Sequence, residues 1–202
     1  MERAASEAWR IAVLTSGHGR GSNLHAMHSY FREHDLPVQI CFVTASKEDA
    51  PVVQLCRELD LSCHVLSIKD MSIFEERLLA LCKESRIDLI ALAGFMKMLS
   101  AEFLTTVGVP VFNIHPALLP KYGGKGMYGM NVHEAVFAAK ERVSGASIHR
   151  VDPIYDHGEI IAQSEVEITD CSSPEEVAAK VLKIEHQLYA PAIYSYLQDS
   201  CK

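Results

Sequence analysis

The sequence predicts one α/β domain with a mostly parallel, twisted sheet, helices on both faces, C-terminal antiparallel strands and a long C-terminal helix. Up to Ile114, short apolar segments alternate with segments of helical periodicity. That pattern is typical of a parallel sheet covered on both sides. Beyond Ile114 the alternation stops, and two longer strand-like segments precede a final helix. The chain of 202 residues shows no repeat and no dividing linker.

The first part of the chain supplies strands and helices in turn. The predicted strands are short apolar segments at Ile11–Thr15, Val38–Val43, His64–Leu66, Leu89–Leu92 and Val111–Ile114. The predicted helices lie between them at Asn23–Phe31, Pro51–Leu59 and Ile73–Glu84. Residues 1–10 lack the apolar core of a signal peptide, so we expect a flexible leader there and a domain over residues 11–202.

The second part of the chain has a different organisation. A glycine-rich loop at Tyr122–Gly129 leads into a helix near His133–Lys140. Two strands at Val143–Val151 and Glu159–Ile168 are expected to pair through the connection at 152–158. The last helix begins at Ser173-Pro174-Glu175-Glu176, where a cap residue, a proline and two acids suit a helix start.

Composition and charge exclude several classes of protein. The net charge of −7 comes from 19 basic and 26 acidic residues without a basic stripe, so nucleic acid is not expected as a partner. No apolar stretch approaches the roughly 20 residues that span a bilayer, so no membrane partner is expected. The six cysteines are scattered without a Cys-x-x-Cys pair, which favours reduced thiols in the cytoplasm. The spacing of His and Cys predicts no metal site.

A pair of polar residues at a strand end, Asn113 and His115, is the most informative feature. Alternate residues of a strand point to the same face, and Pro116 ends the strand, so both side chains lie at its C-terminal tip. Open α/β sheets bind their ligands at that edge. An amide beside an imidazole can stabilise an oxyanion and move a proton. The alternative is that the pair only marks a strand end before a proline-containing loop.

A second polar cluster follows some forty residues later. Asp156 lies in a turn-like stretch that Asp152-Pro153 opens and Gly158 closes. A carboxylate brought against His115 would fix its tautomer and favour the imidazolium. His149, on the preceding strand, is expected to help order the Asn113/His115 pair, although a lone histidine is more often an ordinary core residue. Without a recognisable Ser or Cys nucleophile, this set favours direct attack by a substrate amine on a carbonyl.

The glycine-rich segment between the first strand and the first helix predicts an anion site. Backbone N–H groups and a helix N-terminus there can hold a phosphate. The dinucleotide spacing Gly-x-Gly-x-x-Gly fails because Gly21 comes one residue early, and a Walker loop lacks its Gly-Lys-Ser/Thr. The expected contacts are Gly17, Gly19, Arg20, Gly21, Ser22 and Asn23. Two alternatives stay open, a tight turn without a ligand and an Arg20 that points to solvent.

Two longer motifs resemble the phosphoribosylglycinamide formyltransferases (GAR transformylases), which are folate-dependent formyltransferases. One is Asn113–Tyr122 with Ala91–Ser100 upstream, and the other is Gly145–His149 with Asp156–Gly158 downstream. The resemblance runs from about Ile11 to Leu197. It implies a Rossmann-like formyltransferase fold. It also implies transfer of a formyl group from the co-substrate 10-formyltetrahydrofolate to the amine of glycinamide ribonucleotide, without a metal.

The same resemblance assigns the two ends of the site. It implies that Asn113, His115 and Asp156 are catalytic, and that Glu185 contacts the nucleotide. It places the folate against Phe95, Met96, Lys97, Met98, Leu99, Val151, Asp152 and Asp156. From the residues alone, Glu185 borders the apolar face of the last helix and needs a partner, or else lies at its solvent edge. Phe95 and Met96 can equally be ordinary core. The loop after Tyr122 departs from the family. Members usually carry a pair of histidines there, whereas this chain has Asn131 and then His133.

Several alternatives share parts of this pattern. A formyltetrahydrofolate hydrolase would use the same Asn–His–Asp set but usually adds a regulatory domain, and methionyl-tRNA formyltransferase needs an RNA-binding domain. A formyltransferase acting on another amine, such as an amino sugar nucleotide, also stays open. A non-catalytic folate or nucleotide binder is disfavoured because it has no use for a proton-handling pair. Small-molecule substrates are expected, with a monomer and a homodimer both open.

Overall fold

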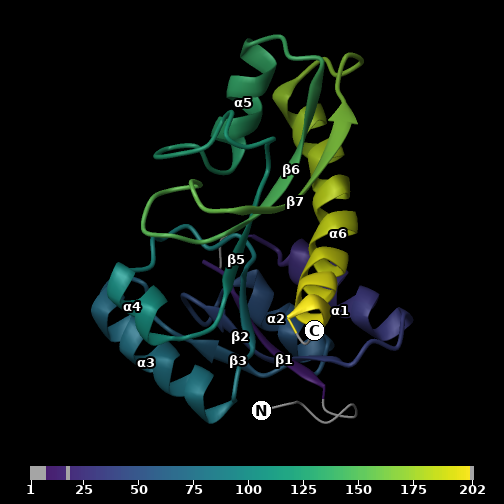
Figure 1. Ribbon diagram of the computed structural model, residues 1–202. Coiled ribbons are helices and arrows are strands. Elements are labelled where there is room, and N and C mark those ends of the chain that lie inside the picture. Colours follow the sequence, from purple (N-terminus) through teal and green to yellow (C-terminus); the bar gives the residue numbers. More distant parts are fainter. Residues whose placement is uncertain (1–7, 17–18, 201–202) are drawn as a thin grey trace.

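A mixed sheet of seven strands forms the centre of the computed structural model, which describes residues 8–16 and 19–200 (Figure 1). The strand order is β3-β2-β1-β4-β5-β6-β7. The strands are β1 Trp9–Leu14, β2 Val38–Ala45, β3 Cys63–Val65, β4 Leu89–Leu92, β5 Val111–His115, β6 Val143–Arg150 and β7 Ile160–Glu167. The pairs from β3 to β5 are parallel, and β6 is antiparallel to both β5 and β7. The predicted fold class is confirmed.

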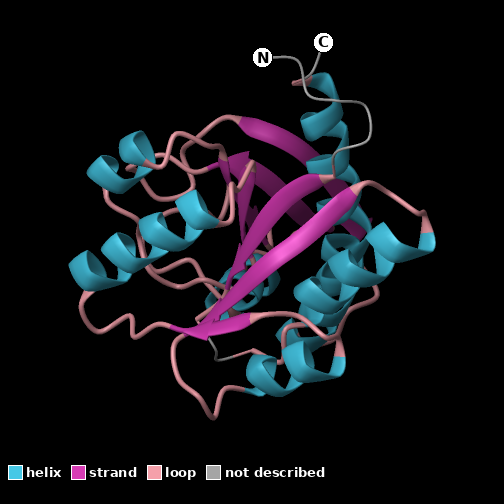
Figure 2. Ribbon diagram, turned by 90° about the horizontal axis from the view of Figure 1, so that it is seen from below, coloured by secondary structure: helices cyan, strands magenta, loops and turns pink. Residues whose placement is uncertain are grey.

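Helices cover both faces of the sheet (Figure 2). They are α1 Ser22–Glu33, α2 Pro51–Glu58, α3 Met71–Glu84, α4 Ala101–Thr106, α5 Met130–Ala138 and α6 Pro174–Asp199. Alternate residues of β1 serve the two faces. Ile11 and Val13 are buried with α1, α2 and α6, whereas Ala12 and Leu14 are buried with α3 and α4. Both faces of β1 are therefore core, which explains its continuous apolar sequence.

The long helix α6 connects the sheet to the outer layer around α5. Its second half packs Tyr189 and Ile193 into the core on the sheet, whereas Val177 and Val181 in its first half pack with α5. The Tyr189 hydroxyl lies 3.0 Å from the carbonyl oxygen of Leu92 and 2.9 Å from that of Phe112. This buried hydroxyl fixes α6 against β4 and β5, the two strands that lead into the site.

The largest differences from the prediction are two element starts and one additional helix. Strand β1 begins at Trp9, so Trp9 and Arg10 belong to the sheet and not to the leader predicted for residues 1–10. Residues 1–7 of that leader lie outside the described residues. Helix α4 was not predicted, because it has only six residues and one of them, Phe103, is buried. Helix α5 begins at Met130, earlier than the predicted start near His133.

The carboxyl ends of β1 and β4 meet where the strand order reverses. The chain winds from β1 to β2 and β3 on one side and from β4 onward on the other. Loops after these two strands are joined, because the Ser16 N–H donates to the Gly94 carbonyl at 3.1 Å and the Met96 N–H donates to Ser16 Oγ at 2.5 Å. Such a reversal leaves a crevice at the sheet edge, where open α/β sheets bind ligands.

Candidate active site

A cavity of about 520 Å³ opens at this edge of the sheet. Its walls come from the ends of β4, β5 and β6, the loops after β4 and β5, the loop before α5, the β6–β7 connection, and one residue each of α1, α5 and α6. The described part of the chain holds no group of three His, Cys, Asp or Glu residues placed to bind a metal ion. Within the same residues, no helix has the length and apolar character needed to cross a bilayer.

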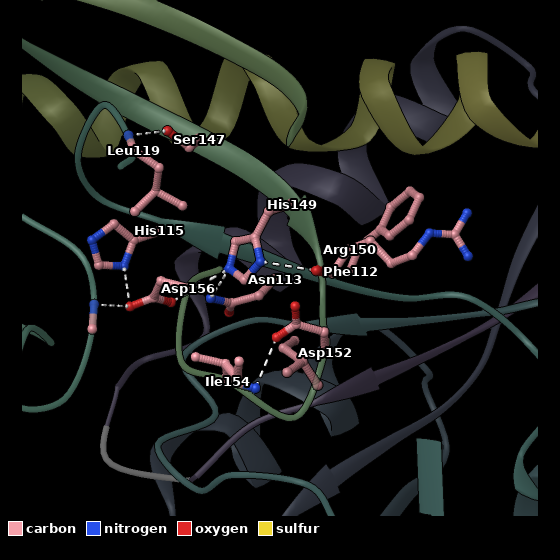
Figure 3. A network of polar contacts seen from close by, with 12 residues as sticks. Phe112, Asn113, His115, Leu119, Ser147, His149, Arg150, Asp152, Ile154 and Asp156 are labelled. Carbon is pink, nitrogen blue, oxygen red and sulfur yellow. Dashed lines mark hydrogen bonds and ion pairs between the residues drawn. The ribbon is translucent and has the colours of Figure 1, made fainter. Parts of the chain in front are cut away.

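Asn113 and His115 reach this cavity from the same face of β5, as predicted. Antiparallel pairing places His149 of β6 directly opposite Asn113. Side chains opposite one another on neighbouring strands share a face and approach closely. Asn113 Nδ2 accordingly lies 3.1 Å from His149 Nε2 (Figure 3). The predicted support from His149 therefore has a direct contact.

Asp156 stands between the two histidines. Its Oδ2 lies 3.5 Å from His115 Nδ1, and its Oδ1 lies 3.4 Å from His149 Nε2 (Figure 3). The Gly124 N–H also donates to Oδ2 at 2.9 Å. Burial alone would raise the pKa of Asp156, but the contact with His149, the nearby His115 and the Gly124 N–H together hold it below its usual value. Asp156 is thus a carboxylate over the physiological range.

His115 is only 3% exposed, and both of its ring nitrogens have neighbours. Nε2 lies 2.7 Å from the Tyr122 carbonyl oxygen, which can only accept, so Nε2 carries a proton. Burial lowers the pKa of His115, and His149 adds to this, while Asp156 and the Tyr122 carbonyl act in the opposite direction. Asp156 thus acts on the pKa of His115 in the predicted direction, but burial outweighs it, so the net pKa lies below the usual value. The favoured form is neutral, with its free lone pair on Nδ1.

A third buried histidine lines the cavity from α5. His133 is 6% exposed, and its Nδ1 has no hydrogen-bond partner within the described chain. Burial, and secondarily His115, lowers its pKa. A neutral imidazole with an unused nitrogen in the cavity wall is available to a polar ligand.

All residues expected to contact the folate line the cavity. Met96 and Met98 are 43% and 45% exposed, so their side chains are free to cover a flat ring. Phe95 and Leu99 are buried in the core beside α3, where Phe95 stacks on Phe74 with ring centroids 5.4 Å apart. The two methionines are thus surface, and Phe95 and Leu99 are core residues whose outer atoms form the wall.

The connection that carries Asp156 is held by its own contacts. Asp152 accepts a hydrogen bond from the Ile154 N–H at 2.8 Å and lies 3.0 Å from His157 Nδ1. Gly158 passes so close to the Arg150 carbonyl that a Cβ atom has no room there. These contacts bring the chain back over the cavity and aim Asp156 inward, with a backbone φ of 53°.

Glu185 of α6 also lines the cavity. It is 8% exposed, and its Oε2 accepts a hydrogen bond from Asn23 Nδ2 at 2.6 Å. Burial raises the pKa of Glu185 to about 7, and the Asn23 contact only partly opposes this. The expected partner is thus Asn23, 162 residues away in the sequence. Asn23 Oδ1 is buried without a partner in the described part of the chain.

The glycine-rich loop contributes less of the cavity wall than predicted. Asn23 lines the cavity, but Gly19, Arg20, Gly21 and Ser22 are not part of its lining, and Gly17 lies outside the described residues. Gly21 has φ 79° and precedes α1, and a Cβ there would lie 2.8 Å from Leu55 Cδ2. This glycine is therefore required by backbone conformation and by the packing of α2. The phosphate role of the loop stays a prediction.

No individual role was predicted for Tyr122 or Gly124. Both act through backbone atoms, which carry no side-chain signature. Tyr122 ends the Asn113–Tyr122 motif, and the Gly123-Gly124 pair that follows it is the one sequence signal for the turn.

Comparison with known proteins agrees with this geometry. The sequence profile of the formyl transferase family matches residues 9–193. The chain belongs to the formyl transferase family. The phosphoribosylglycinamide formyltransferase of Haemophilus influenzae is 32% identical over 183 residues, which cover 89% of this chain and 83% of that protein. The chloroplastic enzyme of that name from Vigna unguiculata is 34% identical over 197 residues, 94% of this chain.

The match to the Vigna protein leaves part of that protein uncovered, because the chain spans 61% of its length. A crystal structure of phosphoribosylglycinamide formyltransferase from Anaplasma phagocytophilum superimposes with a TM-score of 0.84 at 30% identity. It covers 94% of this chain and 87% of that one. The formyltransferase fold that the resemblance implied is confirmed.

Proposed function

We propose that this protein transfers a formyl group from 10-formyltetrahydrofolate to the amine of glycinamide ribonucleotide. One observation carries the proposal. Asn113, His115 and Asp156 converge in a cavity whose wall also contains every residue expected to contact the folate. Membership of the formyl transferase family and the names of the relatives support the same activity.

The site's geometry suggests how the residues divide the chemistry. The substrate amine attacks the formyl carbon and the carbonyl oxygen becomes an oxyanion. Asn113 has two amide hydrogens, and its contact with His149 leaves one of them for the oxyanion. Nδ1 of His115 has a free lone pair in the favoured tautomer, so it can take the proton that the amine loses.

Asp156 then acts on a charge that arises during the reaction. Once Nδ1 is protonated, the imidazolium lies 3.5 Å from Asp156 Oδ2, which stabilises it. The proton is next given to the folate nitrogen as its bond to the formyl carbon breaks, which leaves tetrahydrofolate and a formamide. In this mechanism His115 is charged only during the reaction, whereas the sequence predicted a charge in the resting enzyme.

Glu185 and Asn23 are proposed to position the nucleotide at the other end of the cavity. Their hydrogen bond orients a carboxyl group toward the space between α1 and α6. The N-terminus of α1, beside Gly19–Ser22, is the proposed place of the phosphate. The amine of the nucleotide would then lie between Glu185 and the Asn113/His115 pair.

The experiment that tests the activity compares acceptors. The protein is incubated with 10-formyltetrahydrofolate alone, with glycinamide ribonucleotide, and with an amino sugar nucleotide, and tetrahydrofolate release is followed. We expect release only with glycinamide ribonucleotide. Equal release with water alone would assign the site to a hydrolase, and release only with the amino sugar would reassign the acceptor.

Two further properties stay predictions. A cytoplasmic location rests on the free thiols of Cys41, Cys56, Cys63, Cys82 and Cys171, whereas relatives in plants bear chloroplastic names. Cell fractionation decides between the two compartments. Sedimentation at several concentrations decides between monomer and homodimer.

A further inference from the structure

The backbone of one short turn holds both members of the proton-handling pair. The Tyr122 carbonyl accepts the hydrogen bond from His115 Nε2, and the Gly124 N–H donates to Asp156 Oδ2. The two distances are 2.7 and 2.9 Å. The relative position of His115 and Asp156 therefore depends on the conformation of residues 122–124.

This turn adopts an unusual conformation fitted closely to Asp156. Tyr122 has φ 56° and Gly124 has φ 96°, both in the region that L side chains disfavour. At Gly123, an added Cβ would lie 2.5 Å from Leu119 Cδ2 and 3.2 Å from Asp156 Cβ. A non-glycine residue such as Tyr122 keeps a left-handed conformation only when its surroundings impose it.

The side chain of Tyr122 has one polar contact within the part of the chain that the structure describes. Its hydroxyl donates to Glu141 Oε1 at 2.9 Å, and Lys121 Nζ donates to the same oxygen at 3.1 Å. Contacts with Lys121 and Tyr122 hold the pKa of Glu141 below its usual value, so it is a carboxylate at neutral pH. Glu141 follows α5 and precedes β6, so it is anchored outside the turn.

Packing alone does not fix the tyrosine ring. Tyr122, Glu141 and Ser144 line a cavity of about 230 Å³, and Ser144 Oγ is buried without a partner in the described chain. Tyr122 also packs on the apolar cluster around α5. With space beside it, the ring can turn once the hydrogen bond to Glu141 is removed.

We propose that Tyr122 and Glu141 are positioning residues, whose hydrogen bond sets the 122–124 turn and thereby places His115 and Asp156 relative to one another. The proposal rests on the proposed function for its catalytic consequence. Neither side chain touches the reacting atoms, since each acts through the Tyr122 carbonyl and the Gly124 N–H. The hydrogen bond between Tyr122 and Glu141 thus holds the turn from outside the cavity, and the turn holds His115 and Asp156.

The pKa of His115 reports on this link directly. The charged and titratable groups around His115 are Asp156 from the β6–β7 connection, His149 from β6 and His133 from α5. The hydrogen bond to the Tyr122 carbonyl raises the pKa of His115. When the turn relaxes, that contribution weakens, so the pKa of His115 falls further below its usual value.

The test compares variants that remove or keep the hydrogen bond. Tyr122→Phe removes the donor, Glu141→Leu removes the acceptor, and Glu141→Gln keeps an acceptor oxygen. Tyr194→Phe is the matched control, because within the described residues its hydroxyl accepts one hydrogen bond, from Gln198 of the same helix α6. Each variant is analysed for kcat, for KM of both substrates, and for the His115 titration by NMR with labelled histidine, assigned with a His115→Asn variant.

We expect Tyr122→Phe and Glu141→Leu to lower kcat about three- to tenfold with KM changed less than about twofold, as a loss of half to one pKa unit of basicity would do. The pKa of His115 should fall in both, and Glu141→Gln and Tyr194→Phe should resemble the wild type. An unchanged His115 pKa would overturn the proposal, even if activity or thermal stability fell. Because the titration requires no substrate, it decides the positioning role even if the protein formylates no amine.

Discussion

Asp156 and Glu185 are two little-exposed carboxyl groups in one cavity, yet their pKa values move in opposite directions. Asp156 lies against two imidazoles and a backbone N–H, and its pKa falls. Among the described residues, Glu185 has one side-chain hydrogen-bond partner, the neutral Asn23 amide, and its pKa rises to about 7. Burial penalises both carboxylates, so the partners make the difference. One end of the cavity is built to keep a charge, and the other to exchange a proton.

The largest effect is expected at the charged end. Asp156→Asn keeps the size of the side chain but removes the charge that stabilises a protonated His115. We expect turnover to fall at least about 10²-fold, with modest change in substrate binding, and His115→Ala to do the same. Steady-state kinetics measure this. If either variant keeps more than about half of the wild-type turnover, the proposed mechanism is wrong.

The second largest effect is expected from Glu185, on the binding of the nucleotide substrate. Glu185→Gln removes the charge and keeps one acceptor. We expect affinity for the nucleotide to fall about tenfold to a hundredfold, since a charge-assisted hydrogen bond contributes about 1.5–3 kcal/mol. Affinity for the folate should barely change. Calorimetric titration with each ligand checks this, and equal weakening of both would point to a damaged fold instead.

Glu185→Gln also tests the opposite pKa shifts of Glu185 and Asp156 through the pH dependence of the free energy of unfolding. A carboxyl whose pKa is raised in the folded state binds more protons folded than unfolded between its ordinary pKa of 4.5 and about 7. Wild-type stability therefore declines as pH rises through that window. We expect Glu185→Gln to gain about 2 kcal/mol over the wild type between pH 5 and pH 8. Urea unfolding at both pH values tests this, and a gap independent of pH would refute the raised pKa.

The smallest effect is expected from an exposed charge. Arg20 is exposed near the start of α1, where water screens its interactions. If it contacts the phosphate, Arg20→Ala should weaken nucleotide binding only about two- to fivefold, the range of exposed ion pairs. A loss as large as that of Glu185→Gln would show that the phosphate draws Arg20 into a buried contact. Unchanged nucleotide affinity would show that Arg20 points to solvent and does not contact the phosphate.

The strand-end residues could be predicted from the sequence because a strand imposes its own geometry. Asn113 and His115 share a face through the two-residue period, and Pro116 marks where the strand stops. Glycine and proline around Asp156 indicated a turn, and the turn does return to the cavity. These features follow from local rules, so one segment is enough to predict each of them.

Features that depend on distant packing escaped prediction. The burial of Glu185 arises where α6 meets α1, and its partner is distant in sequence. The neutral state of His115 depends on how completely the surrounding loops exclude water, which no residue pattern reveals. Tyr122 and Gly124 act through their backbones. Helix α4 is too short for helical periodicity to stand out.

The most direct test of the whole account follows the formyl carbon itself. The wild-type protein and Asp156→Asn are mixed in excess with ¹³C-formyl-labelled 10-formyltetrahydrofolate and glycinamide ribonucleotide, and single-turnover samples are read by ¹³C NMR. The account predicts that the label moves to the nucleotide formamide in the wild type and at least about 10²-fold more slowly in Asp156→Asn. Label found as free formate, or transferred equally fast by both proteins, would contradict it.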